Sequence, residues 1–451
     1  MIEEFKYEGK WWLPDKPEEK IIGTLKYTPG KEVVLDLEGS FGDLRDIKER
    51  PTILGFSPEG KYITLYKCVG PWTSYHIPGY PKSSFHAIYV FIGAHFQKKE
   101  DIKFKRLYVH YSHLNEWVDI SGFEKEHDIQ HLFDKEEKEI KYKLPKSIQA
   151  AINDDYKIFI DFRAYPESSE QEVCIKQRTY IKIEPSEERS FGEFLNILHH
   201  IQNFLSLGTM KPVYPLTIEG ITEANNPVEI FYSLPYTSKA PMKLPPFDML
   251  FTFKDISDRF EVFLRNWFEK ADLLEPVYDL YFGTLYTPDM YIQHQFLSLI
   301  QAIESFHRRR YGGKYLPDDD YKRVRDVLEN AIPDEVENNH RQSLESRIRY
   351  GNEFSLRTRL KEIFDKYQEN LNEFIERKEA FIGCVVDTRN YLTHYEEDPE
   401  KCVARGEDLY HFIQKLKILL EICLLTELGF SSEEIKDLFS RNRRFRHKFI
   451  Q

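Results

Sequence analysis

The chain has 451 residues, of which 41% are hydrophobic and 15% aromatic, and its formal net charge is −12 at pH 7. This length exceeds what a single core usually fills, so two or three domains are expected, and the apolar content excludes an intrinsically disordered protein. The negative charge excludes a surface that is basic throughout, so any nucleic acid has to bind locally.

The N-terminus and the cysteines carry no targeting or metal signal. The first residues lack the charged and apolar regions of a signal peptide, and no run of about 18 apolar residues occurs. We therefore expect a cytoplasmic protein without membrane attachment. The five cysteines are odd in number and form no Cys-x-x-Cys pair, which argues against both a disulfide framework and a zinc site. All five are expected to be reduced core residues: Cys68, Cys174, Cys384, Cys402 and Cys423.

A strand pattern dominates the first 235 residues. Residues 32–39 show the period of two, with Val33, Leu35 and Leu37 on one face, and residues 62–68 repeat it. Further strands are predicted at 85–96, 104–111, 156–165, 172–183 and 228–233. Short strands between turn residues favour a β-sandwich or two small sheets. One helix is predicted at 190–207, and its adjacent His199 and His200 point about 100° apart, which excludes joint binding of one metal.

Four prolines between residues 234 and 248 mark a linker, after which the period becomes helical. Helices are predicted at 260–271, 289–310, 319–330, 357–368, 371–392 and 404–428. Gly429 fits a C-terminal cap, and Ser431 with Glu434 forms a capping box for one last short helix. The predicted fold class is α+β multidomain: a β-rich, sandwich-like sensor or regulatory region at 1–235, which can hold two subdomains, a linker with a connecting helix at 236–285, and a helical bundle at 286–451.

One pair of residues in the bundle suits RNA cleavage. This chemistry needs a base for the 2′-hydroxyl, an acid for the 5′-oxygen and a cation on the phosphate, which histidine and arginine supply without a metal or cofactor. Three Arg/His pairs have a suitable spacing, and about two are expected by chance. They are Arg389/His394, Arg405/His411 and Arg441/His447. The first alone lies where a long amphipathic helix runs out into a polar loop.

This segment carries a family resemblance. Residues 387–395, Asp-Thr-Arg-Asn-Tyr-Leu-Thr-His-Tyr, resemble the Arg-polar-x(3–5)-His signature of the HEPN superfamily. Residues 296–308 look like the first helix of ApeA-type HEPN domains. Four N-terminal segments are similar to the β-rich domain that precedes HEPN in ApeA-type anti-phage proteins: 11–14, 23–27, 35–39 and 114–117.

The resemblance implies a metal-independent endoribonuclease of an anti-phage (abortive infection) or toxin-like system, which works as a homodimer on RNA, with tRNA among the candidate substrates. Its N-terminal half is expected to sense an unknown phage-derived trigger or to restrain the nuclease. The resemblance also implies that His394 is the general acid or base, that Arg389 binds the scissile phosphate, and that Asn390 orients its neighbours. Tyr395 is a candidate for contact with the substrate. Residues five apart on a helix are turned by about 140°. Either the helix therefore ends before His394 or two chains share one cleft, and both can hold.

Other charged groups have two interpretations each. The basic tail at 440–451 includes Arg441, Arg443 and Arg444 and fits RNA binding as well as a solvated chain end. The cluster 307–310 is better explained as the cationic end of a helix, and 318–320 as an acidic helix start.

Alternatives to the ribonuclease remain. One is a HEPN module that binds RNA or nucleotides without cutting. In another, Arg389 and His394 only make helix-end contacts to carbonyls or to Glu396, Glu397 and Asp398. The aromatic N-terminal half is also compatible with binding of carbohydrate or peptide, although such aromatics usually belong to the core.

Overall fold

The computed structural model describes residues 4–41, 52–74, 81–124, 141–232, 243–395, 398 and 400–448. The chain forms two units, one of residues 1–209 and 213–265 and one of residues 210–212 and 266–451. Residues 243–265 therefore belong with the β-rich part. The prolines at 235 and 241 lie outside the described residues.

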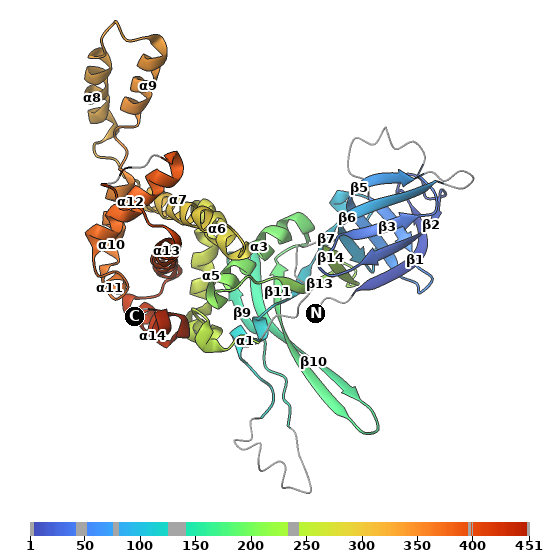
Figure 1. Cartoon of the computed structure of the whole chain (residues 1–451). Helices are drawn as coiled ribbons and strands as arrows, with labels where there is room; N and C mark the ends of the chain where they lie inside the picture. The colour runs from blue at the N-terminus through green and yellow to red at the C-terminus, as the bar shows by residue number, and fades with distance from the viewer. Residues whose placement is uncertain are drawn as a thin grey trace. The chain divides into compact units, whose positions relative to one another are not determined.

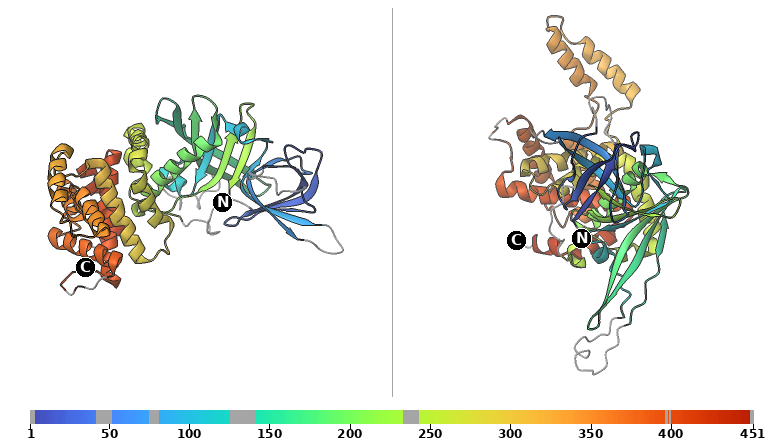
Figure 2. Two further views of the ribbon diagram at one scale, coloured as in Figure 1. Left: turned by 90° about the horizontal axis from the view of Figure 1, so that it is seen from above. Right: turned by 90° about the vertical axis from the view of Figure 1, so that its right-hand side faces the viewer.

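Six strands of the first unit close into a barrel (Figures 1 and 2). Their order is β3-β2-β1-β4-β5-β6, and pairing of β3 with β6 completes the ring. The strands are β1 (Phe5–Trp12), β2 (Ile21–Tyr27), β3 (Val33–Leu37), β4 (Ile53–Phe56), β5 (Tyr62–Ser74) and β6 (Lys82–Ile92). The predicted sandwich is thus wrong for this part, because a period of two shows which residues face inward but not whether a sheet closes on itself.

Trp11 fills the barrel interior and explains a glycine in the wall. Its side chain is fully buried, and its Nε1 donates to the carbonyl of Gly23 at 3.1 Å. A Cβ on Gly55, which lies opposite Trp11 across the β1–β4 pairing, would overlap the indole ring. The strand β4 therefore needs glycine at this position.

Strand β6 continues from the barrel into an open antiparallel sheet. Its residues 83–87 pair with β3, and its residues 89–92 pair with β14. The sheet order continues as β14 (Pro227–Tyr232), β13 (Pro215–Ile221), β8 (Arg106–Tyr111), β11 (Val173–Pro185), β10 (Tyr156–Ser168) and β9 (Ile148–Ala151). The seven predicted strands are confirmed, although 104–111 divides into β7 (Lys103–Phe104) and β8. Strands β1, β2, β4, β9 and β13 and the two-residue strand β12 (Arg189–Ser190) were not predicted.

Helix α3 (Phe191–Thr209) confirms the predicted helix at 190–207. Its N-terminal Phe191 packs edge-to-face on Phe91 and Phe104, and the carbonyl of Leu198 accepts a hydrogen bond from the Tyr111 hydroxyl at 3.1 Å. Short elements complete the unit: η2 (Lys99–Asp101), α1 (Leu114–Val118), β12 (Arg189–Ser190), η3 (Pro246–Asp248), α4 (Phe253–Ile256) and η4 (Ser257–Arg259). Helix α5 (Phe260–Glu269) leads into the second unit.

The second unit is all helical, as predicted. Its elements are α6 (Ala271–Tyr286), α7 (Ile292–Tyr311), α8 (Asp318–Asn330), α9 (Asn338–Arg349), α10 (Leu356–Lys366), α11 (Gln368–Leu371), α12 (Lys378–His394), α13 (Gly406–Leu428), α14 (Ser432–Arg441) and α15 (Arg443–Lys448). Helix α13 is central, with buried residues on most of its circumference. Helices α8 and α9 form a hairpin that stands apart from the other helices of this unit (Figure 1). The Gly429 cap and the Ser431/Glu434 capping box are confirmed.

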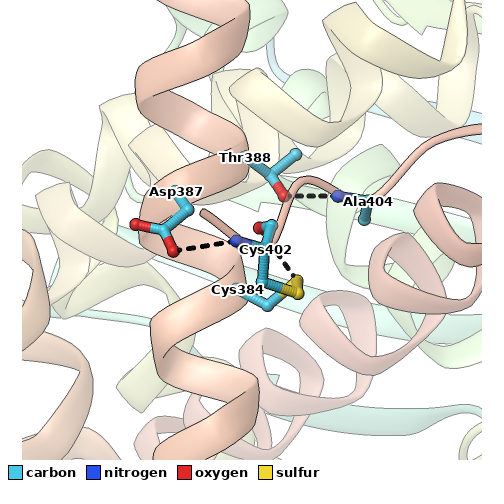
Figure 3. Close-up of a disulfide and its surroundings, with 5 residues drawn as sticks. All are labelled: Cys384, Asp387, Thr388, Cys402 and Ala404. Atoms are coloured by element: carbon cyan, nitrogen blue, oxygen red, sulfur yellow. Dashed lines mark hydrogen bonds between the residues drawn. A yellow bond between two sulfur atoms is a disulfide. The ribbon is translucent and has the colours of Figure 1, made fainter. Parts of the chain in front are cut away.

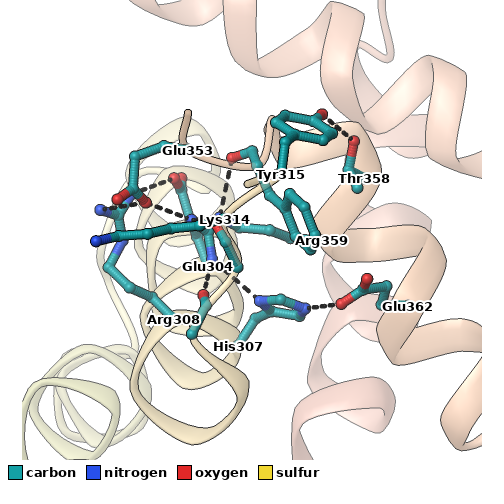
Figure 4. A network of polar contacts seen from close by, with 12 residues as sticks. Glu304, His307, Arg308, Lys314, Tyr315, Glu353, Thr358, Arg359 and Glu362 are labelled. Atoms are coloured by element: carbon teal, nitrogen blue, oxygen red, sulfur yellow. Dashed lines mark hydrogen bonds and ion pairs between the residues drawn. The ribbon is translucent and has the colours of Figure 1, made fainter. Parts of the chain in front are cut away.

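A buried polar network joins α7 to α10 (Figure 4). Arg359 has no exposed surface and donates to His307 Nδ1 at 3.0 Å and to Glu353 at 2.9 Å. Arginine only donates, so the proton of the neutral imidazole sits on Nε2, which lies 2.7 Å from Glu362. The rest of the cluster 307–310 is also structural, since Arg308 pairs with Glu304 and Glu353, and Arg310 pairs with Glu427. These pairings support the helix-end interpretation of this cluster.

Acid is expected to weaken the helical unit through His307. Burial, the largest cause, and the neighbouring Arg359 lower the pKa of His307 below 6.5. The unfolded chain then binds more protons than the native one, so the free energy of unfolding falls as pH drops below about 6.5. Urea unfolding followed by far-UV circular dichroism at about pH 7.5 and about pH 5.5 measures this loss. His307→Gln should reduce the pH dependence, whereas His340→Gln on the exposed surface of α9 should retain it.

Candidate active site

Helix α12 carries the predicted catalytic residues. It begins at Lys378, not at 371 as predicted, because α11 ends at Leu371 and the chain then turns aside. The Asn370 amide donates to the carbonyl of Ser432 at 2.8 Å, and Phe374 packs on Phe439 with ring centroids 5.4 Å apart. Packing against the C-terminal helices thus breaks a helix that the sequence pattern predicts as continuous.

His394 is the last helical residue of α12. Tyr395 follows in the left-handed conformation, with a φ of 54°, and its N–H donates to the carbonyl of Tyr391. The predicted end of the helix before His394 is therefore wrong. Arg389 and His394 stand on one regular helix, about 140° apart in direction, and do not face a common point within this chain.

The outward surface of α12 lies between these two residues. Val385, Thr388 and Leu392 are buried in the bundle. A second stripe, Val386, Asn390 and Thr393 at spacings of four and three, faces away from them. By helical geometry Arg389 and His394 lie about 70° to either side of this stripe. Arg389 and Asn390 are half-buried and His394 is exposed.

The candidate catalytic side chains have no polar partner within the described part of the chain. There, the side chains of Arg389, Asn390 and His394 make no hydrogen bond or ion pair. Asp398 pairs with Lys401 at 3.1 Å, and Glu396 and Glu397 lie outside the described residues. Tyr395 is 67% exposed, with its ring 5.6 Å from that of Tyr391. The arrangement leaves an arginine, an amide and a histidine available to a phosphate or to another chain.

Residues 400–405 pack along the side of α12 that carries Asp387 and Thr388 (Figure 3). Cys384 and Cys402 form a disulfide, with Cα atoms 4.8 Å apart, so two of the five cysteines predicted to be reduced are bridged. The prediction from the cysteine pattern was wrong because Cys384 and Cys402 are 18 residues apart in the sequence, and only the folded chain brings them together. The N–H of Cys402 donates to Asp387 at 3.3 Å, and that of Ala404 donates to the Thr388 hydroxyl at 3.0 Å. Cys68 and Cys423 are buried and free, and Cys174 is free and half-buried.

Two arginines of the basic tail, Arg441 and Arg444, have partners within the helical unit. Arg444 donates to Glu421, which is 1% exposed, at 3.4 Å and to Gln414 at 3.0 Å. Arg441 pairs with Asp437 on the same helix at 3.3 Å, and Phe445 is buried against Phe439. Arg443 lies in α15 and also has a partner. The structure does not bring these arginines together with Arg389, and their assignment to substrate binding stays a prediction.

The residues that support the motif were missed in the sequence. Asp387 and Thr388 hold the segment after α12, and the Arg405 guanidinium lies over the Tyr391 ring, 4.8 Å from its centroid. Asp387 and Thr388 directly precede the motif, but only the fold reveals what they bind. Among the described residues, no group of three or more His, Cys, Asp or Glu is arranged to hold a metal, and no helix is long and apolar enough to cross a membrane.

Together these features define a helical domain of the HEPN type, preceded by a β-rich domain that contains a barrel. Residues 297–434 match the Apea-like HEPN family model, and residues 6–267, more than half of the chain, match ApeA N-terminal domain 1. The chain therefore belongs to the ApeA family, as the resemblance predicted. No curated protein and no solved structure matches it. A HEPN domain is consistent with a ribonuclease and with RNA as substrate.

Proposed function

We propose that this protein is a metal-independent endoribonuclease whose active centre is built on α12. One observation supports the proposal most strongly. Asn390 on the outward stripe of α12, with Arg389 and His394 on either side of it, makes no side-chain hydrogen bond or ion pair within the described residues, and neither do its two neighbours. All three lie inside the matched HEPN domain. His394 acts as general acid or base, Arg389 stabilises the charge that develops on the phosphate, and Asn390 orients one of them by hydrogen bonding. The 2′-hydroxyl attacks the adjacent phosphate, so the product ends in a 2′,3′-cyclic phosphate.

Arg389 and His394 point about 140° apart on one helix and cannot contact the same phosphate, but a homodimer can bring together an arginine and a histidine from two chains. In a two-fold pair with the α12 helices parallel and packed on the stripe Val386, Asn390 and Thr393, the Arg389 flank of one helix borders the same groove as the His394 flank of the other. The pair then contains two composite sites, each with an arginine from one chain and a histidine from its partner. The half-buried, apolar Val386 on this stripe is compatible with such packing.

Complementation between inactive variants tests the composite site. Arg389→Ala and His394→Ala should each be inactive alone, and an equal mixture should regain roughly a quarter of the wild-type rate. Half of the dimers in the mixture are mixed, and each mixed dimer contains one complete site. The measurement is cleavage of a labelled RNA after the variants are mixed and allowed to exchange subunits. A mixture as inactive as its components, although mixed dimers form, would refute the shared site.

We infer the biological setting from the match of the N-terminal domain. We propose that residues 6–267 restrain the nuclease until a phage-derived trigger is present, so that the protein limits infection by cutting RNA, tRNA among the candidate substrates. Mapping cleavage positions and end groups in cellular RNA, with and without phage, for wild type and His394→Ala tests this role. Intact RNA with undiminished RNA binding in every condition would instead identify a binding module without catalysis.

A further inference from the structure

We propose that Cys384 and Cys402 form a thiol–disulfide exchange site that controls the order of the polypeptide next to His394. The bridge joins the middle of α12 to the segment that precedes α13 and closes a covalent ring across a sequence separation of 18. Arg389, Asn390 and His394 all lie inside this ring. The effect on RNA cleavage rests on the proposed function, whereas the exchange reaction itself does not.

The tethered segment lies along the face of α12 that holds His394. Asp387, Tyr391 and His394 are spaced by four and three residues and so share one side of the helix. The N–H of Cys402 binds Asp387, and Arg405 covers the ring of Tyr391. The Tyr391 ring in turn contacts that of Tyr395, the residue that caps the helix directly after His394. The bridge at Cys402 therefore fixes a series of contacts that ends at the turn carrying His394.

Two backbone hydrogen bonds also tie the segment to α12 in the described part of the chain. When the bridge is absent, the hydrogen bonds from the N–H groups of Cys402 and Ala404 still link it to Asp387 and Thr388. Ala404 is buried, but Cys402 is exposed, and the hydrogen bond at Cys402 measures 3.3 Å. Reduction is thus expected to free residues 400–403 first, and to loosen Arg405 and the Tyr391–Tyr395 contact after them.

A small thiol can reach the bridge. An open groove of about 670 Å³ is lined by both cysteines, and its lining also includes the cationic Arg377 and Lys415 and the acidic Glu376 and Asp408. Side chains of both signs suit a zwitterionic, peptide-like thiol or its disulfide, the class to which glutathione belongs. Exposed disulfides in a thiol-rich compartment are typically the labile, regulatory ones.

The exchange proceeds in two steps and begins at Cys402, the exposed residue of the bridged pair. A small thiolate attacks Cys402 Sγ, a mixed disulfide forms, and Cys384 leaves as a thiolate that takes up a proton. A second small thiolate attacks the mixed disulfide, so two thiols are oxidised to one small disulfide and both cysteines end as thiols. A small disulfide reverses the sequence and restores the bridge.

The test uses the full-length chain equilibrated in buffers of reduced and oxidised glutathione. Alkylation and mass spectrometry count the thiols, hydrogen exchange reports on residues 391–395 and 400–404, and a labelled RNA reports on cleavage. Reduction should expose two further thiols, speed amide exchange in this segment by about tenfold and lower the cleavage rate by about tenfold. Cys402→Ser and Cys384→Ser should behave as the reduced protein in every buffer. Cys174→Ser, which removes a free cysteine of the β-rich unit, should respond like wild type.

Two results would overturn the proposal: no bridge in the oxidised chain, or a bridge whose reduction changes neither amide exchange nor cleavage. A chain that cuts no RNA in either state, even when an extract of phage-infected cells supplies the trigger, refutes the ribonuclease proposal alone. Thiol counts and amide exchange still decide whether the exchange site exists and orders the segment.

Discussion

Replacing His394 with alanine is expected to lower the rate of RNA cleavage by about 10²–10⁴-fold, the usual contribution of a general acid or base. Arg389→Ala should cost about 10²–10³-fold, because a positioned donor to the developing charge is lost. Arg389→Lys should fall between Arg389→Ala and wild type, since lysine keeps the charge but not the planar fork of donors. Rates of cleavage of a labelled RNA under single-turnover conditions provide the comparison.

The same variants should fold normally. Neither side chain has a hydrogen bond or ion pair within the described residues, so each alanine should change the free energy of unfolding by less than about 0.5 kcal/mol. His340→Ala and Arg347→Ala, on the exposed surface of the α8–α9 hairpin, are the matched controls and should cleave at the wild-type rate. If both α12 variants cleave as fast as these controls, the active centre lies elsewhere.

Arg359→Ala is expected to be strongly destabilising, at about 3–5 kcal/mol. The guanidinium has no exposed surface and donates to the carbonyls of Phe354 and Gly312 as well as to His307 and Glu353. Its removal leaves a buried imidazole nitrogen and two carbonyls without their donor, besides a cavity. Urea unfolding followed by far-UV circular dichroism gives the loss.

An exposed lysine on the same helix, paired with a glutamate of α12, supplies the control for Arg359. Lys361 of α10 pairs with Glu379 at 2.9 Å, but both side chains are substantially exposed. Lys361→Ala should therefore cost no more than about 1 kcal/mol. Equal losses for Lys361→Ala and Arg359→Ala would show that burial of the arginine network does not contribute to stability in the way proposed.

The sequence was informative where local chemistry decides the structure. Alternation at Val33, Leu35 and Leu37 predicted a strand, and all three are buried in β3. Gly429 and the Ser431/Glu434 pair predicted helix ends, because caps act within one turn. Residues 387–395 predicted the family, and the matches to both domains confirm it.

The sequence was not informative where contacts between residues far apart in the chain determine the structure. Closure of the barrel depends on pairing between Val33 and Ala87, which no local pattern encodes. The start of α12 depends on packing of Phe374 against Phe439, and the disulfide on a turn that returns Cys402 to Cys384. At the candidate site, the motif was visible in the sequence, whereas its supports at Asp387, Thr388 and Arg405 were not.

Strand β6 has a consequence for dividing the N-terminal unit. Residues 83–87 of this strand complete the barrel by pairing with β3, and residues 89–92 begin the open sheet by pairing with β14. The barrel and the open sheet therefore share one strand. A fragment that ends after the barrel would leave the N–H and C=O groups of residues 89–92 as a bare edge, free to pair with a strand of another molecule. The barrel and the open sheet are therefore expected to fold as one unit, since neither can be cut from the chain without exposing an unpaired strand edge.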